Sequence, residues 1–194
     1  MQTEAVPAAD DRVQRRHREL LARLETILLR EGFSGLTVGD IASRLRCSRR
    51  SIYELAPSKD ELVLSVVDNF FSEVRRAAIE ASPAHLEPGE RVFQYLKPAV
   101  AAAQRMSTAL VTDIDAWEPS RQLWQTHMRE RVEGLRRIVE DGIRAGAFKG
   151  VHAHLVAETV FASISRLRDP DFYTGTDMTI AEAFEEYYAM LIDA

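Results

Sequence analysis

Arginine side chains gather in one short stretch of this sequence. Arg44, Arg46, Arg49 and Arg50 lie within seven residues and surround the single cysteine, Cys47. A guanidinium group presents its N–H donors in a fixed fork that fits a phosphate or the edge of a guanine base. Side chains of this kind at this density favour contact with a polyanion.

Charge is distributed unevenly along the chain, whose formal net charge is −5. Residues 11–60 hold 11 Lys and Arg against 7 Asp and Glu, whereas residues 61–194 hold 14 against 21. A basic first third on an acidic body predicts that only the first third meets a nucleic acid or another polyanion. Charge alone leaves open a second interpretation, a chance cluster on a solvated face.

The spacing from Thr37 to Tyr53 predicts a helix-turn-helix that would position these arginines. A short helix over residues 38–45 is followed by a tight turn, and a second helix starts at Ser48 with Ile52 packed inward. Such a second helix fits the major groove of B-DNA, with its N-terminal residues closest to the base edges. Arg49 and Arg50 could bind guanine edges or phosphates there.

Hydrophobic spacing is helical nearly everywhere else, and no alternating strand pattern or internal repeat occurs. The chain is therefore predicted to be all-α, with about nine helices in two parts. We expect a disordered tail over 1–10, a DNA-binding domain over 11–57 and a larger helical domain over 58–194. Thr37, Ser58 and Thr179 each precede an acidic residue by three, the spacing of a helix-capping box. The helices expected in the larger domain cover residues 58–81, 90–104, 107–116, 119–145, 151–167 and 180–192.

The stretch LTVGDIASRLRCSRRSIYELAPSKDELV resembles the DNA-binding segment of TetR-family transcriptional regulators. The match lies in Thr37, Ile41–Ala42, Ser48, Tyr53 and the Pro-Ser-Lys step at 57–59. The resemblance implies a three-helix DNA-binding domain followed by a helical domain that binds an effector and dimerises. It also implies phosphate contacts and base-edge contacts. The phosphate contacts fall to Thr37, Ser48, Tyr53 and Lys59, and the base-edge contacts to Arg49, Arg50 and Ser51.

Three positions depart from the family pattern. Arg46 stands where the turn usually carries glycine, so a left-handed backbone there would cost about 1 kcal/mol or more. Ala56 replaces an aromatic residue before the Pro-Ser-Lys step, and Glu54 puts a negative charge near the expected phosphates. We expect these changes to alter the packing under the third helix and the contacts with the operator.

A small ligand and a second copy of the chain are also implied. Helical bundles can leave an apolar cavity with a few polar groups, and regulators of this family bind an effector there. We expect a largely apolar effector and a homodimer in which the last two helices of each chain pack together. The candidate effector contacts are Asp113, Trp117, Trp124 and His127. The candidate dimer contacts are Leu155, Thr159, Ser163, Phe184, Tyr187 and Tyr188.

No motif in the sequence indicates catalysis, a cofactor or a metal site. His152 and His154 are two residues apart and would point to different faces of a helix. No phosphate-binding glycine pattern or nucleophile elbow occurs. No apolar run reaches the ~18 residues that span a bilayer, and one cysteine fits a reducing cytoplasm. Cys47 is expected to act as a small apolar side chain rather than as a redox switch.

Together with the resemblance, which implies a ligand-responsive homodimer on a pseudo-palindromic operator in double-stranded DNA and most often a repressor, the sequence predicts a cytoplasmic transcriptional regulator. Two alternatives stay open. One is a helical small-molecule-binding protein or enzyme whose helix-turn-helix has lost its function. The other is an interaction module whose basic end binds an acidic protein.

Overall fold

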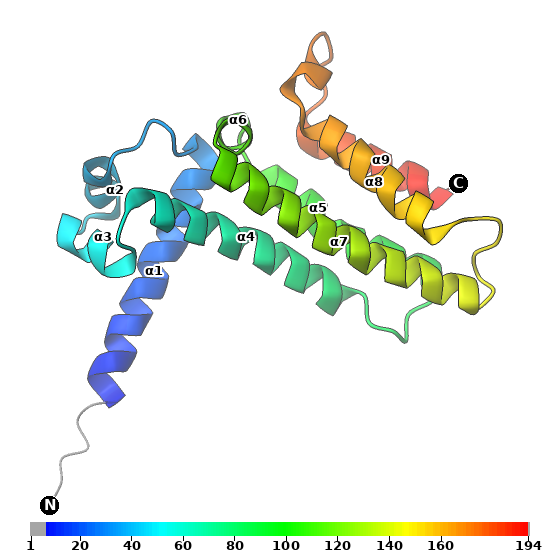
Figure 1. Cartoon of the computed structure of the whole chain (residues 1–194), viewed down its shortest axis with the longest axis horizontal. Coiled ribbons are helices and arrows are strands. Elements are labelled where there is room, and N and C mark those ends of the chain that lie inside the picture. Colours follow the sequence, from blue (N-terminus) through cyan, green and yellow to red (C-terminus); the bar gives the residue numbers. More distant parts are fainter. Residues whose placement is uncertain (1–6, 194) are drawn as a thin grey trace, which may run out of the picture.

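The computed structural model describes residues 7–193, and in this range it contains nine α-helices and one short 3₁₀ helix, without a strand (Figure 1). The prediction of an all-α fold with about nine helices is confirmed. The helices are α1 (Pro7–Glu31), α2 (Val38–Leu45), α3 (Arg49–Leu55), α4 (Lys59–Ala81), α5 (Pro88–Arg105), α6 (Thr108–Ala116), α7 (Glu118–Arg144), α8 (Ala153–Arg168), η1 (Pro170–Tyr173) and α9 (Ile180–Asp193).

The tail expected over residues 1–10 lies partly outside the described residues. Residues 1–6 lie outside the described residues, and α1 already begins at Pro7, where proline suits the first turn of a helix. Among residues 7–193, no helix is both long and apolar enough to cross a membrane.

Helices α1, α2 and α3 form a small domain at one end of the molecule (Figure 1). Its core consists of aliphatic side chains that are at most 1% exposed, and α1 supplies two of them at a spacing of four residues. These side chains fix α2 and α3 against α1. They are Leu24, Leu28, Ile41, Leu45 and Ile52.

Local signals set the ends of α2 and α3. Thr37 and Asp40 form the predicted capping box at the start of α2, and Ser48 caps α3 by accepting a hydrogen bond from the backbone N–H of Ser51. Arg46 ends α2 with φ 53° and ψ 47°, so it adopts the left-handed conformation that glycine usually takes in this turn. Arg46 is the one non-glycine residue with positive φ between residues 7 and 193.

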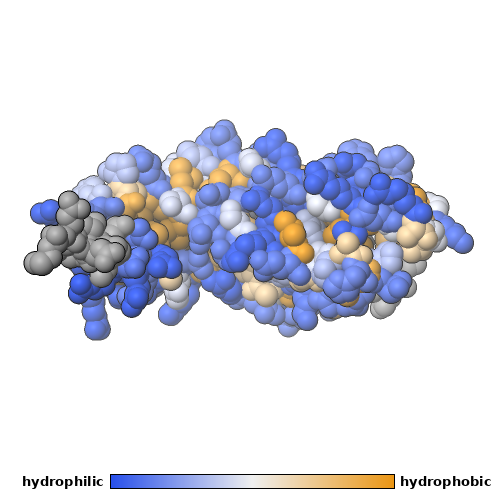
Figure 2. Space-filling view, turned by 90° about the horizontal axis from the view of Figure 1, so that it is seen from below, coloured by the Kyte–Doolittle hydropathy of each residue, from blue (hydrophilic) through white to orange (hydrophobic). Residues whose placement is uncertain are grey.

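The larger domain is a bundle in which α4, α5 and α7 lie side by side, with α8 and α9 covering one flank (Figure 1). Helix α4 starts next to α3 and runs the length of the bundle, so it belongs to both domains. The visible face in Figure 2 is mostly hydrophilic, and hydrophobic side chains appear there only in small separate areas.

Helix α6 holds the two domains together at the end of α1. The backbone N–H of Ser107 donates to the carbonyl of Leu29 at 2.8 Å. The Asp113 carboxylate accepts hydrogen bonds from the backbone N–H groups of Phe33 and Ser34, at 2.5 and 2.8 Å. The rings of Phe33 and Trp117 meet edge to face, with centroids 5.7 Å apart. The loop that leads into α2 is therefore tied to a helix of the larger domain.

Candidate DNA interface and effector cavity

Helix α3 buries one side and exposes the other, as expected for a recognition helix. Ile52 is 1% exposed and packs on the core, whereas the side chain of Arg50 is 89% exposed and Tyr53 is 55% exposed. Arg49 and Ser48 are exposed as well. The exposed face therefore presents two guanidinium groups, a hydroxyl group and an aromatic ring in two turns of helix.

Two contacts within the chain restrain these arginines, one an ion pair and one a close approach to a glycine. The Arg50 Nε lies 3.2 Å from Oε1 of Glu54, one helical turn further on. The guanidinium of Arg49 lies over Gly39 of α2, 2.8 Å from the position that a Cβ atom would take there. Both side chains are long enough to leave these contacts, and exposed ion pairs contribute little to stability. Glu54 is thus paired with a neighbouring arginine in the free protein.

Thr37, Ser48 and Lys59 each lie at or beside a helix N-terminus, where free N–H groups and the helix dipole favour an anion. All three side chains reach the surface at least in part. Ser51 differs from its predicted role, because it is 8% exposed and its Oγ lies 3.0 Å from the Ser48 Oγ. Ser51 therefore supports the start of α3 from inside rather than facing outward.

Arg44 does not join the exposed face of α3. Its guanidinium forms an ion pair with Glu31 at the end of α1. Cys47 is half-buried and packs against the core of the small domain, and Ala56 is buried at 9% exposure. The cluster of arginines thus divides into one that pairs with α1, one that forms the turn and two on α3.

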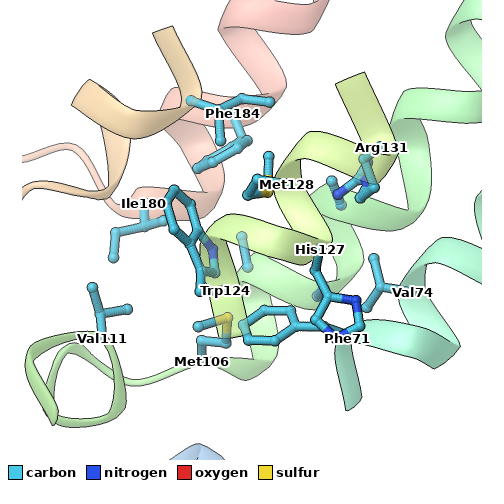
Figure 3. Close-up of a pocket in the computed structure, with 14 residues that line it drawn as sticks. Phe71, Val74, Met106, Val111, Trp124, His127, Met128, Arg131, Ile180 and Phe184 are labelled. Atoms are coloured by element: carbon cyan, nitrogen blue, oxygen red, sulfur yellow. The ribbon is translucent and has the colours of Figure 1, made fainter. Parts of the chain in front are cut away.

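A cavity of about 60 Å³ lies in the larger domain (Figure 3). Residues from α4, α5, α7 and α9 surround it, and α8 contributes Ile164. Most of its lining is apolar, and the exceptions are His127 and Arg131 of α7. The full lining is Phe71, Val74, Ala99, Ala102, Ala103, Met106, Val111, Trp124, His127, Met128, Arg131, Ile164, Ile180 and Phe184.

His127 and Arg131 are both buried, at 5% and 8% exposure. Nε2 of His127 lies 2.7 Å from Oδ1 of Asp68, and its Nδ1 has no hydrogen-bond partner. Nε of Arg131 also lacks a hydrogen-bond partner. Burial raises the pKa of the Tyr95 hydroxyl, and the positive charge of Arg131 opposes this shift. The cavity therefore combines apolar walls with two polar side chains that have unused hydrogen-bonding capacity.

The four candidate effector residues separate into two pairs. Trp124 and His127 line the cavity, one turn apart on α7. Asp113 and Trp117 do not line it, because they contact the loop that precedes α2. Helical spacing could not distinguish the two pairs, because it does not show which neighbouring element each side chain meets.

The candidate dimer residues lie on α8 and α9 but on different sides of them. Leu155 is 65% exposed and Thr159 is exposed. Phe184 is 4% exposed and lines the cavity, so its side chain lies inside one chain. Tyr187 and Ser163 are half-buried, and this burial raises the pKa of the Tyr187 hydroxyl. The side chain of Tyr188 lies outside the described residues.

Two family models match consecutive parts of the chain. The model described as "Bacterial regulatory proteins, tetR family" matches residues 20–66, and the model described as "Tetracyclin repressor-like, C-terminal domain" matches residues 94–187. The chain belongs to the TetR family. It is therefore a DNA-binding transcriptional regulator of helix-turn-helix type, and the expectation that it is not an enzyme agrees with this family.

Other transcriptional regulators resemble this chain over nearly its whole length. The uncharacterized HTH-type transcriptional regulator YvaF of Bacillus subtilis is 22% identical over 182 residues, which cover 91% of this chain and 93% of YvaF. A transcriptional regulator from Cytophaga hutchinsonii matches in structure with a TM-score of 0.74 and 15% identity, over 91% of this chain and 94% of its own. A regulator from Saccharomonospora viridis, solved in complex with choline, matches with a TM-score of 0.73 and 17% identity, over 93% and 96%.

Arg131 is the residue of this TetR-family chain that sequence reasoning missed. It falls on the buried stripe of α7, with Trp124 and Met128 before it and Leu135 and Ile138 after it. These five positions are alternately four and three residues apart, the spacing of one helix face. A charged residue inside such a stripe is the signal that could have identified it.

Proposed function

We propose that this TetR-family chain is a repressor that binds a pseudo-palindromic operator as a homodimer and is released by a small-molecule effector. The observation that carries the proposal is the exposed basic face of α3, together with the capped N-termini of α2 and α3 at Thr37 and Ser48. In a two-fold dimer, two such helices would enter successive major grooves about 34–36 Å apart.

The contacts with DNA divide into two kinds. Arg49 and Arg50 would read base edges, since they lie at the N-terminal end of α3 and can bond guanine in bidentate fashion. Backbone phosphates would be bound by a second set of side chains, which fix the position of α3 without reading sequence. This second set is Thr37, Ser48, Tyr53 and Lys59.

The effector would release the protein from DNA by moving α6 and α4. A ligand changes a conformational equilibrium only if it binds the two states with different affinity. The cavity is lined by α4 and by Val111 of α6, and α6 also holds the loop before α2 through Asp113. A ligand that shifts these helices would change the distance between the two α3 helices of a dimer and so weaken operator binding.

The test begins with selection of binding sites from random DNA, followed by titration of the selected duplex. Arg50→Ala should lose about 1–3 kcal/mol of discrimination at one base position of each half-site. Lys59→Ala should weaken binding to all sequences equally and reduce the salt slope by about one unit. Arg129→Ala replaces an exposed arginine of α7 and is the matched control.

The DNA-binding assignment is wrong if Arg50→Ala and Lys59→Ala both bind the selected duplex as the parent protein and the Arg129→Ala control do. Complete absence of salt-dependent DNA binding at low ionic strength would instead favour a small-molecule-binding protein without regulatory DNA contacts.

The dimer is tested separately by sedimentation. Leu155 is a large apolar side chain left 65% exposed on α8, and Met190 on α9 is 61% exposed. Leu155→Glu should shift the protein to monomers at micromolar concentration, because it places a charge in an apolar contact. An unchanged dimer in this variant would show that these helices do not form the interface.

A further inference from the structure

The cavity contains a buried positive charge that lacks a negative partner. Arg131 is 8% exposed, and among the side chains that the structure describes no carboxylate lies within the 4.0 Å of an ion pair with it. Its Nε has no hydrogen-bond partner either. Buried charges are usually paired, because removing an ion from water costs several kcal/mol unless a partner replaces the water.

The acidic side chains nearest to Arg131 along α7 are paired with other groups. Glu130 forms an ion pair with Arg75 of α4, and Glu133 binds two arginines of its own helix. Those arginines lower the pKa of Glu133 to about 2, so its carboxylate is held in the ionised, paired state. The hydroxyl of Tyr95 donates to the backbone carbonyl of Arg131, at 2.8 Å. None of these groups neutralises the guanidinium.

His127 does not offer a second anion site. Its Nε2 faces the Asp68 carboxylate at 2.7 Å, so in the neutral ring the proton lies on Nε2 and Nδ1 is an acceptor. Arg131 is therefore the group in the cavity that favours negative charge, and in the neutral ring Nδ1 of His127 would accept a hydrogen bond from a ligand.

The remaining walls fit an apolar body. Figure 3 shows the rings of Trp124 and Phe184 facing the cavity together with the side chain of Met128, while Arg131 lies further along the same helix as Trp124. Methionine side chains adapt readily to a ligand. The open space of about 60 Å³ is small, so a ligand would have to displace Met106 or Met128 to fit.

We propose that the effector of this regulator is an amphipathic carboxylate, whose anionic group pairs with Arg131 and whose hydrocarbon part lies among Trp124, Met128 and Phe184. This inference rests on the proposed effector site and adds the chemical class of the ligand. The carboxylate would complete the ion pair that the protein leaves open, and the apolar part would gain from leaving water.

Binding can be measured without DNA, through the fluorescence of Trp124. The chain holds two tryptophans, so Trp117→Phe leaves Trp124 as the single reporter. The probes are hexanoate, octanoate and decanoate, each compared with the alcohol and the trimethylammonium ion of the same chain length. We expect each carboxylate to bind at least about tenfold more tightly than its alcohol. The cationic series should bind more weakly than the alcohols.

Arg131→Met removes the charge and puts an apolar side chain of similar length in its place. It should therefore abolish the preference for carboxylate over alcohol and leave alcohol binding unchanged. Arg131→Lys should retain part of the preference. Arg129→Met makes the same replacement at an exposed position of α7 and should change nothing.

Equal affinity for carboxylate and alcohol, tighter binding of the cations, or no binding of any probe up to about 1 mM would each overturn the proposal. An unchanged preference in Arg131→Met would do so too. Titration of the same preparations with the selected operator separates this failure from failure of the proposed function, because DNA binding does not depend on the ligand class.

Discussion

Asp113→Ala should destabilise the protein by cutting the link between α6 and the loop before α2. The carboxylate accepts two backbone hydrogen bonds at one oxygen, from Phe33 at 2.5 Å and from Ser34 at 2.8 Å. A hydrogen bond to a charged group contributes about 1.5–3 kcal/mol, and Ser34 is exposed, so its share is at the low end. We expect the free energy of unfolding to fall by about 3–4.5 kcal/mol, the sum of the two bonds.

The matched control is Thr112→Ala, which changes an exposed neighbour in the same helix. Alanine raises helix propensity at both positions by a similar amount, so this gain cancels in the comparison. Asp113→Asn should lie between the two, because an amide oxygen can still accept both bonds but carries no charge.

Urea unfolding gives the free energies, and hydrogen exchange follows the amides of Phe33 and Ser34. Exchange of these two amides should accelerate in Asp113→Ala and stay slow in Thr112→Ala. The reasoning fails if Asp113→Ala and Thr112→Ala differ by less than about 0.5 kcal/mol, since differences of that size are ordinary for surface positions.

Three further predictions concern the DNA-binding domain. Arg46→Gly should raise the free energy of unfolding by about 1 kcal/mol in urea titrations, because glycine adopts φ 53° without the Cβ clash. Gly32→Ala should destabilise far more than Gly35→Ala in the same assay: Gly32 has φ 72° and its added Cβ would lie 2.3 Å from Oδ2 of Asp113, whereas nothing lies within 4 Å at Gly35. Asp40 has a lowered pKa because its carboxylate accepts from the side chain and backbone of Thr37. Its contribution to stability is therefore present above about pH 4 and lost as the pH falls through the lowered pKa, so Asp40→Asn and the parent should converge in acid when unfolding is followed against pH.

Much of the fold could be predicted from local signals. The hydroxyls of Thr37, Ser58 and Thr179 each cap a helix as their spacing predicted. The helices of the larger domain begin and end within two residues of the expected positions. Capping and helical periodicity depend on residues a few positions apart, so a single sequence contains them.

Residues of the site could be predicted only where the helix face on which they lie determines their exposure. The exposed positions of Arg50 and Tyr53 follow from the burial of Ile52 between them. The hydrogen-bond partners of Asp113 lie about 80 residues away in sequence, so helical periodicity could not predict them. Phe184 was assigned to the dimer and lies in the cavity for the same reason, because an apolar stripe does not say which surface will cover it.

Helices α8 and α9 have two sides with different uses. Ile164, Ile180 and Phe184 close the cavity from within, while Leu155 and Met190 remain exposed outside. If the outer side forms the dimer, one thin wall separates the effector from the partner chain. Thermodynamic reciprocity then requires that an effector which moves this wall also change the dissociation constant of the dimer by the same factor by which dimerisation changes effector affinity. Apparent effector affinity would then vary with protein concentration, so the cellular abundance of the regulator would set its sensitivity.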